Sequence, residues 1–255
     1  MQKLLNRVPE ITLFFWVIKI MATTVGETAA DFLSFTMKLG LTHTSYVMSG
    51  LLVIALLLQF KLKRYIPASY WLVLVLVSVV GTLITDNLVD NLGVSLVTIT
   101  ALFSMALAVV FAVWYAREKN LSIHSIYTAR RELFYWAAIL FTFALGTAAG
   151  DLVAERLAMG YALSALMFGT GIGVITLAYY RFKLNAVLAF WLAYILTRPF
   201  GASMGDLLSQ PLSAGGLGLG TVSTSGIFLV AIVALIAYLS VQQKKQHTLP
   251  VQSSH

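Results

Sequence analysis

Four aspartates recur in this chain at one fixed distance from a tryptophan and a glycine. Each tryptophan follows another aromatic residue, a glycine stands ten residues after the tryptophan, and an aspartate stands five residues after the glycine. The tryptophans are Trp16, Trp71, Trp136 and Trp191, the glycines are Gly26, Gly81, Gly146 and Gly201, and the aspartates are Asp31, Asp86, Asp151 and Asp206. Four matches at identical spacing indicate that one unit was duplicated.

A polar stripe accompanies each aspartate, because positions four apart share one face of a helix. The stripes hold seven of the ten acidic residues. They comprise Glu27 and Asp31; Thr82, Asp86 and Asp90; Thr147, Asp151 and Glu155; and Ala202, Asp206 and Gln210. One Asp in the middle of a membrane costs roughly 2.5–3.5 kcal/mol on insertion scales. The stripes must therefore face one another, a wet cavity or the water outside.

Carboxylate and hydroxyl oxygens are hard ligands, which suit Mg²⁺, Mn²⁺, Ca²⁺, Na⁺ or a proton. The predicted metal ligands are Glu27, Asp31, Asp86, Asp151 and Asp206. The wider set of predicted ion- or substrate-binding residues adds Asp90, Glu155, Thr82, Thr147, Lys19 and Arg198. The chain has no Cys, which excludes thiolate sites. The alternative is that the aspartates only end helices or accept hydrogen bonds from neighbouring units.

Two basic residues lie inside apolar segments. Lys19 shares a helix face with Glu27, and Arg198 directly precedes Pro199. Because proline removes a helix hydrogen bond, we expect a broken or kinked span whose freed backbone groups could line a binding cavity. The alternative is a kink whose freed groups Thr197 and Ser203 satisfy, with Arg198 paired to one of the acids. For Glu27 the alternative is an ion pair with Lys19 or Arg198 that only locks the bundle.

The elements that must position these groups are membrane helices. Of the 255 residues, 59% are hydrophobic and 11% are charged, which excludes an ordinary soluble enzyme. Apolar stretches of about 20 residues, enough to cross a bilayer as a helix, recur eight times. They cover residues 11–35, 44–60, 67–88, 94–115, 133–155, 161–180, 185–208 and 225–241. The predicted fold class is all-α, a polytopic bundle of four parallel two-helix repeats.

The basic residues predict the orientation of the bundle. Thirteen of the 17 lie before the first span, between spans two and three, four and five, or six and seven, or after the eighth. The positive-inside rule then places both termini in the cytoplasm and the aspartates in the outer third. The aromatic pairs, together with Trp114, are expected at the cytoplasmic interface as belt residues. The repeated glycines are expected to let the motif helices pack closely.

The chain divides into two halves offset by 120 residues. Residues 1–120 carry repeats one and two, residues 121–245 carry repeats three and four, and residues 246–255 form a polar cytoplasmic tail. The segment 211–226 is too rich in Gly and Ser for a span, and is interpreted either as a lid or re-entrant loop or as a flexible connector.

The repeated pattern resembles a bacterial family of multi-pass "membrane-anchored" proteins, which are built from four copies of a repeat of unknown function. The resemblance rests on PEITLFFWVIKIMATTVGETAADFL, RRELFYWAAILFTFALGTAAGDL and FWLAYILTRPFGASMGDLL, with SYWLVLVLVSVVGTLITDNLVD as the weakest copy. It implies an integral protein of the bacterial cytoplasmic membrane, and it implies no established activity.

The residues favour a secondary transporter or channel for a small hard cation. The alternative is a non-transporting scaffold or sensor subunit, and a third hypothesis is a small-anion carrier that uses Lys19 and Arg198. No catalytic spacing is present, so an enzyme is not expected, and neither is a cofactor. The expected partners are the lipid bilayer and a small ion or solute, without nucleic acid, because the basic residues form short clusters between spans.

Overall fold

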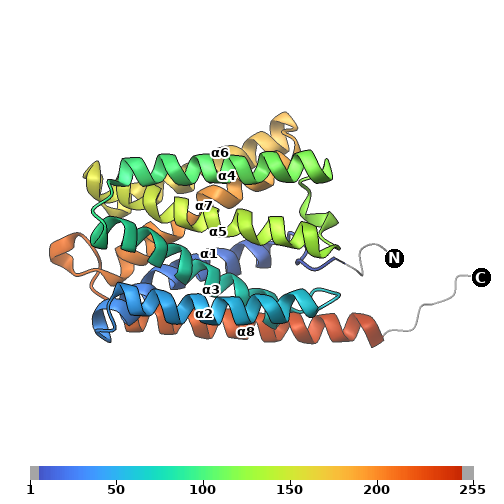
Figure 1. Cartoon of the computed structure of the whole chain (residues 1–255), viewed down its shortest axis with the longest axis horizontal. Helices are drawn as coiled ribbons and strands as arrows, with labels where there is room; N and C mark the ends of the chain where they lie inside the picture. The colour runs from blue at the N-terminus through green and yellow to red at the C-terminus, as the bar shows by residue number, and fades with distance from the viewer. Residues whose placement is uncertain (1–5, 249–255) are drawn as a thin grey trace, which may run out of the picture.

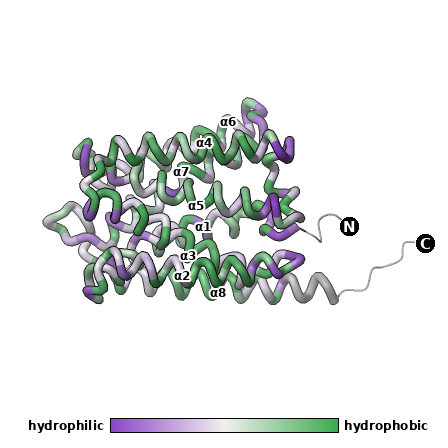
Figure 2. The backbone as a smooth tube through the Cα atoms, in the orientation of Figure 1, coloured by the Kyte–Doolittle hydropathy of each residue, from purple (hydrophilic) through white to green (hydrophobic). Residues whose placement is uncertain are grey.

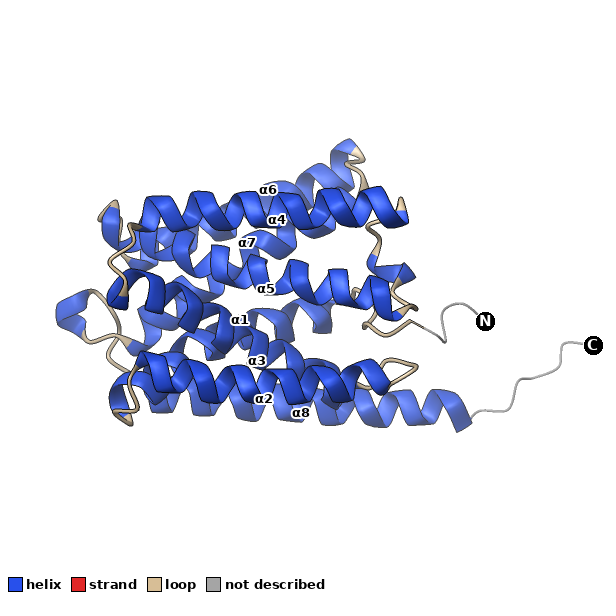
Figure 3. Ribbon diagram, viewed as in Figure 1, coloured by secondary structure: helices blue, strands red, loops and turns tan. Residues whose placement is uncertain are grey.

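The computed structural model describes residues 6–248, with the side chains of its last helix described as far as residue 242. This part of the chain contains eight long helices and no strand (Figure 1, Figure 3). The helices are α1 (Leu13–Asp31), α2 (Leu41–Lys61), α3 (Pro67–Asp86), α4 (Leu96–Glu118), α5 (Ala129–Asp151), α6 (Tyr161–Phe182), α7 (Ala186–Ser209) and α8 (Thr221–Thr248). The eight predicted spans are confirmed.

All eight helices are long and apolar enough to cross a membrane. Apolar residues cover the middle of the bundle, and hydrophilic residues gather toward its ends (Figure 2). A helix satisfies its backbone hydrogen bonds within its own segment, which is the condition for lying in lipid. The chain is an integral, multi-pass membrane protein.

The helices form an inner ring and an outer layer. In the ring, α1 packs on α3, α3 on α5, α5 on α7, and α7 on α1. In the outer layer, α2 packs on α3, α4 on α5, α6 on α7, and α8 returns to cover α1. The motif-bearing helices are thus the inner ones, and they begin at one end of the bundle and finish at the other (Figure 1).

The repeated glycines lie where neighbouring inner helices touch. A Cβ added to any of them would overlap atoms of the next helix in the ring. The contacts are Gly26 with Ser78, Gly81 with Phe143, Gly146 with Arg198, and Gly201 with Thr23. The predicted packing role of the glycines is confirmed, and the four contacts close the ring around one axis.

Seven of the eight aromatic residues in the repeated pairs are buried inside the bundle and Trp16 is half-buried, so their predicted place in an interfacial belt is wrong. Tyr70 and Tyr135 are fully buried, and their hydroxyls are 2.5 Å apart. Trp114 is also fully buried, stacked on Phe134 with ring centroids 6.2 Å apart. Because four units converge on the axis, these rings fill the core at the end opposite the aspartates.

The seventh span is a continuous helix through Pro199, so the predicted break is wrong. Polar side chains of α1 donate to carbonyl groups around the proline. Lys19 Nζ donates to the Tyr194 carbonyl at 2.7 Å, and Thr24 Oγ1 donates to the Gly201 carbonyl at 3.2 Å. These donors come from a neighbouring helix and hold α7 against α1 on both sides of the proline.

The loop before α8 folds back on the end of α7. Leu217 N–H donates to the Leu207 carbonyl at 2.6 Å, and Leu219 N–H donates to the Leu208 carbonyl at 3.0 Å. Helix α8 already begins at Thr221, so the predicted loop 211–226 is six residues too long. The helix extends to Thr248, and residues 249–255 of the predicted tail lie outside the described residues.

Candidate functional site

A cavity of about 140 Å³ opens where the four inner helices finish. All seven acidic residues of the polar stripes line it. Its lining consists of Glu27, Asp31, Phe35, Asp86, Val89, Asp90, Leu96, Asp151, Glu155, Asp206 and Gln210. The equivalent aspartates therefore share one pocket, although no residue of the glycine-rich loop 211–220 contributes to it.

A π-helical turn follows three of the four aspartates directly. The turns are Phe32–Thr36, Asn87–Asn91 and Leu152–Arg156. Such wider turns are frequent at functional sites. They carry Asp90 and Glu155, both exposed, at the cavity mouth. In the fourth unit the α-helix continues to Ser209, and Gln210 Nε2 donates across the mouth to Asp31 Oδ2 at 3.3 Å.

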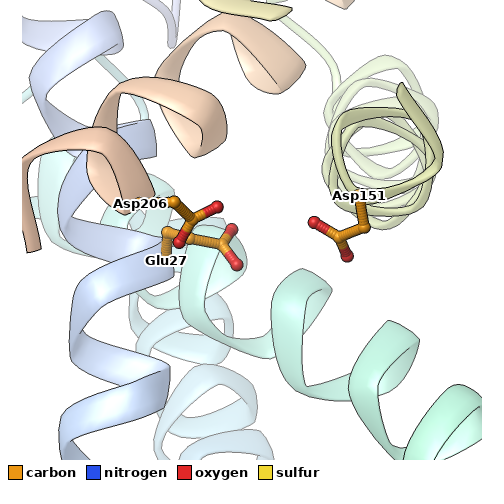
Figure 4. A group of neighbouring side chains, drawn as sticks. All are labelled: Glu27, Asp151 and Asp206. Atoms are coloured by element: carbon orange, nitrogen blue, oxygen red, sulfur yellow. The ribbon is translucent and has the colours of Figure 1, made fainter. Parts of the chain in front are cut away.

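Three carboxylates meet at the inner part of the cavity. Glu27, Asp151 and Asp206 each offer one oxygen, and these oxygens all lie within 4.8 Å of one another. Figure 4 shows Glu27 of α1 beside Asp206 of α7, both facing Asp151 of α5. In an octahedral site with Mg–O distances of about 2.1 Å, ligand oxygens lie about 3 to 4.2 Å apart. With Ca–O distances of about 2.4 Å this range extends to about 4.8 Å, so the separations in the cluster do not exceed those of a site for one hard cation and its waters.

Most of the aspartates do not tie the helices together. Asp206 is only 8% exposed, and its carboxylate has no hydrogen-bond or ion-pair partner within residues 6–248. The carboxylates of Asp86 and Asp151, which are half-buried, likewise have none in this part of the chain. A buried carboxylate without a partner is costly, so water, a proton or a cation in the cavity must compensate it. In the alternative, the aspartates bond to neighbouring units. Among the described residues, the only such direct bond runs from Gln210 to Asp31.

Arg198 lies fully buried directly below the carboxylates. Its Nη2 donates to Glu27 Oε2 at 3.0 Å, to Thr147 Oγ1 at 2.7 Å and to Thr82 Oγ1. Its Nη1 donates to the Thr23 carbonyl at 3.2 Å. The structure thus brings Arg198, Thr82 and Thr147 together with Glu27. The ion pair of Glu27 with Arg198, which was the alternative in which the pair only locks the bundle, is present.

Lys19 is not brought to the acidic residues. Its Nζ donates to the Tyr194 carbonyl and to Thr197 Oγ1, and lies 3.9 Å from the centre of the Tyr194 ring. It is fully buried, has no acidic partner within the described residues, and does not line the cavity. The helix face that Lys19 shares with Glu27 and Asp31 is therefore divided. Glu27 and Asp31 line the cavity, and Lys19 lies outside it.

A second buried carboxylate, Glu132, was missed by the sequence reasoning. It is fully buried at the opposite end of the bundle, where Arg7 Nη1 lies 2.6 Å from Glu132 Oε2. Gln59 Nε2 donates to Glu132 Oε1 at 3.1 Å. Glu132 has no acidic counterpart in the other three units, so a search for repeated positions could not find it.

The comparisons with known proteins agree with the fourfold architecture. Neither the curated proteins nor the solved structures contain a match. One family model, described as a Repeat of Unknown Function (DUF347), matches four times, at residues 14–65, 69–120, 134–185 and 189–245. These matches cover most of the chain, and each begins beside one repeated tryptophan. The chain belongs to the family built from this repeat.

Proposed function

We propose that this protein is a secondary transporter or channel for a small hard cation. A divalent ion of the Mg²⁺ or Mn²⁺ type is the first candidate, and Na⁺ and the proton are the others. The observation that carries the proposal is the convergence of Glu27, Asp151 and Asp206, with Asp206 buried and without a protein partner. Oxygen ligands of this kind favour hard cations over soft ones.

We also infer the place and orientation of the protein. The basic residues of the loops between α2 and α3, α4 and α5, and α6 and α7 lie at the end opposite the cavity. By the positive-inside rule, that end faces the cytoplasm of a bacterium and the cavity faces outward. The protein needs no resident cofactor in this proposal and performs no covalent chemistry.

The test is cation flux through the purified protein in lipid vesicles. Mn²⁺ uptake is followed with a dye inside the vesicles, and Mg²⁺, Ca²⁺, Na⁺ and protons are assayed in parallel. We expect Asp206→Asn, which keeps the shape but removes the charge, to lower the initial rate at least tenfold, about 1.4 kcal/mol or more. Glu118→Gln is the matched control, because Glu118 pairs with Arg131 at the other end of the bundle.

The proposal fails if the wild-type protein moves none of these cations. It also fails if Asp206→Asn transports as fast as the wild type while both remain folded. Thermal unfolding in detergent, with and without Mn²⁺, shows whether each variant is folded and whether it binds the ion.

A scaffold or sensor subunit is the second candidate function, and the buried ion pair between Glu27 and Arg198 favours it. In that case the aspartate variants lower thermal stability and added cations shift nothing. The anion carrier receives no comparable support. Lys19 lies outside the cavity lining, and Arg198 is already engaged by Glu27.

A further inference from the structure

Arg198 breaks the fourfold symmetry at the centre of the inner ring. The equivalent positions in the other units are Thr23, Ser78 and Phe143. From α7, the guanidinium reaches Glu27 on α1, Thr82 on α3 and Thr147 on α5. One fixed positive charge is thereby bonded to all three other inner helices, immediately below the carboxylates.

The axis carries further obstacles beyond Arg198. The Arg198 guanidinium lies 5.3 Å and Lys19 Nζ 5.5 Å from the centre of the same Phe143 ring, so a second basic group follows the first. The hydroxyls of Tyr70 and Tyr135 then meet at 2.5 Å within the aromatic layer. A cation that moved straight down the axis would meet the positive charge of Arg198 in a low-dielectric interior, where repulsion between like charges is strong.

Glu27 belongs to both the cavity and the Arg198 contact. Its Oε2 accepts from Arg198 and, at 3.3 Å, from Thr82. The same carboxylate also lies within the cluster formed with Asp151 and Asp206. An ion bound there and Arg198 therefore both draw on the charge of one carboxylate. If Glu27 turns to the ion, Arg198 keeps its bonds to Thr82, Thr147 and the Thr23 carbonyl.

We infer that Arg198 is the gate of the cation path and makes the protein a carrier instead of an open channel. This inference rests on the proposed function. Arg198 closes the inner end of the site, and its bonds to Thr82, Thr147 and the Thr23 carbonyl keep it there when a bound divalent cation draws Glu27 away. A divalent ion attracts the Glu27 carboxylate with two positive charges. Na⁺ attracts it with one, which is the same charge as that of the guanidinium. Arg198 therefore also selects for divalent cations.

The experiment uses the full chain in lipid vesicles and compares Arg198→Gln with the wild type. Three rates are measured. They are Mn²⁺ uptake into vesicles that contain Mn²⁺, Mn²⁺ uptake into vesicles without it, and Na⁺ uptake driven by an imposed potential. For the wild type we expect internal Mn²⁺ to accelerate uptake severalfold, and Na⁺ entry to stay at the level of empty vesicles. For Arg198→Gln we expect this acceleration to vanish and Na⁺ entry to rise at least tenfold.

The matched control is Arg131→Gln, which also removes an arginine bonded to a carboxylate, 2.7 Å away, but far from the cavity. It should behave like the wild type. Arg198→Lys keeps the positive charge but loses the planar guanidinium with its several N–H donors. We therefore expect a Na⁺ leak between that of the wild type and that of Arg198→Gln. The inference is overturned if the wild type conducts Na⁺ freely, or if folded Arg198→Gln keeps both the acceleration and the exclusion of Na⁺.

A second variant covers the case in which Arg198→Gln does not fold. In Glu27→Gln, Arg198 keeps its threonine and carbonyl partners, so we expect Mn²⁺ uptake to drop at least tenfold while Na⁺ stays excluded. A Na⁺ leak in this variant would contradict the gate. Failure of the gate is distinguishable from failure of the proposed function: cations then still cross and still depend on Asp206, but not on Arg198.

Discussion

At the scale of single residues, the centre of the protein depends on the pairing of Glu27 with Arg198. Both side chains are buried, and the arginine has no exposed surface at all. Removing one member of a buried ion pair is more harmful than removing both, because the remaining charge stays desolvated without a partner. The pair therefore contributes to stability as a unit, whatever its part in transport.

We predict strong non-additivity at this pair. Arg198→Met alone should lower the free energy of unfolding by about 3–5 kcal/mol, because it leaves Glu27 buried and unpaired. The double variant Arg198→Met with Glu27→Leu should recover most of this loss. Unfolding in mixed detergent, followed by circular dichroism, measures both values. Losses that simply add would show that the two side chains are not energetically coupled.

At the scale of helices, the contacts of the repeated glycines hold the inner ring together. A Cβ at Gly201 would overlap the Thr23 side chain and lie 3.3 Å from the Ile20 carbonyl oxygen of α1. A carbonyl oxygen belongs to the backbone and cannot rotate away. The glycines thus fix how closely the inner helices approach, and this close approach brings the carboxylates near one another.

A pair of glycine substitutions should have effects of opposite sign. Gly201→Ala should destabilise the protein by about 1–3 kcal/mol through overpacking. Gly50→Ala on α2, where nothing lies within 4 Å of the new Cβ, should stabilise it by up to about 1 kcal/mol, because alanine is the better helix former. Thermal unfolding of the two variants decides the point. Equal effects would mean that the ring does not depend on close glycine contacts.

At the scale of the whole molecule, the bundle has two different ends. One end holds the acidic cavity, and the other is closed by the aromatic layer and by the buried contact of Glu132 with Arg7. The closed end also carries most of the basic loop residues. This polarity is the basis of the orientation that we infer from the positive-inside rule.

The absence of cysteine makes the orientation directly testable. We expect Glu155→Cys, at the exposed cavity mouth, to react with a membrane-impermeant maleimide in intact cells. Arg64→Cys, exposed in the loop between α2 and α3, should react only after the membrane is permeabilised. The reverse labelling pattern would place the cavity in the cytoplasm and reverse the inferred orientation.

The sequence by itself determined the spans, the fourfold repeat and the common height of the repeated aspartates. The spans follow from hydropathy, which is a local property. The common height follows from duplication, because units of two spans must all run in the same direction. Only the rotation of each helix about its own axis was left open.

The tertiary structure decided that rotation and everything that depends on it. It placed Trp114 and the repeated aromatic residues in the core instead of at the lipid interface. It paired Arg198 with Glu27, and it placed Lys19 where it donates to Tyr194 and Thr197. These choices depend on which side chains meet across the axis and how far each one reaches, and residue spacing along a single helix does not contain that information.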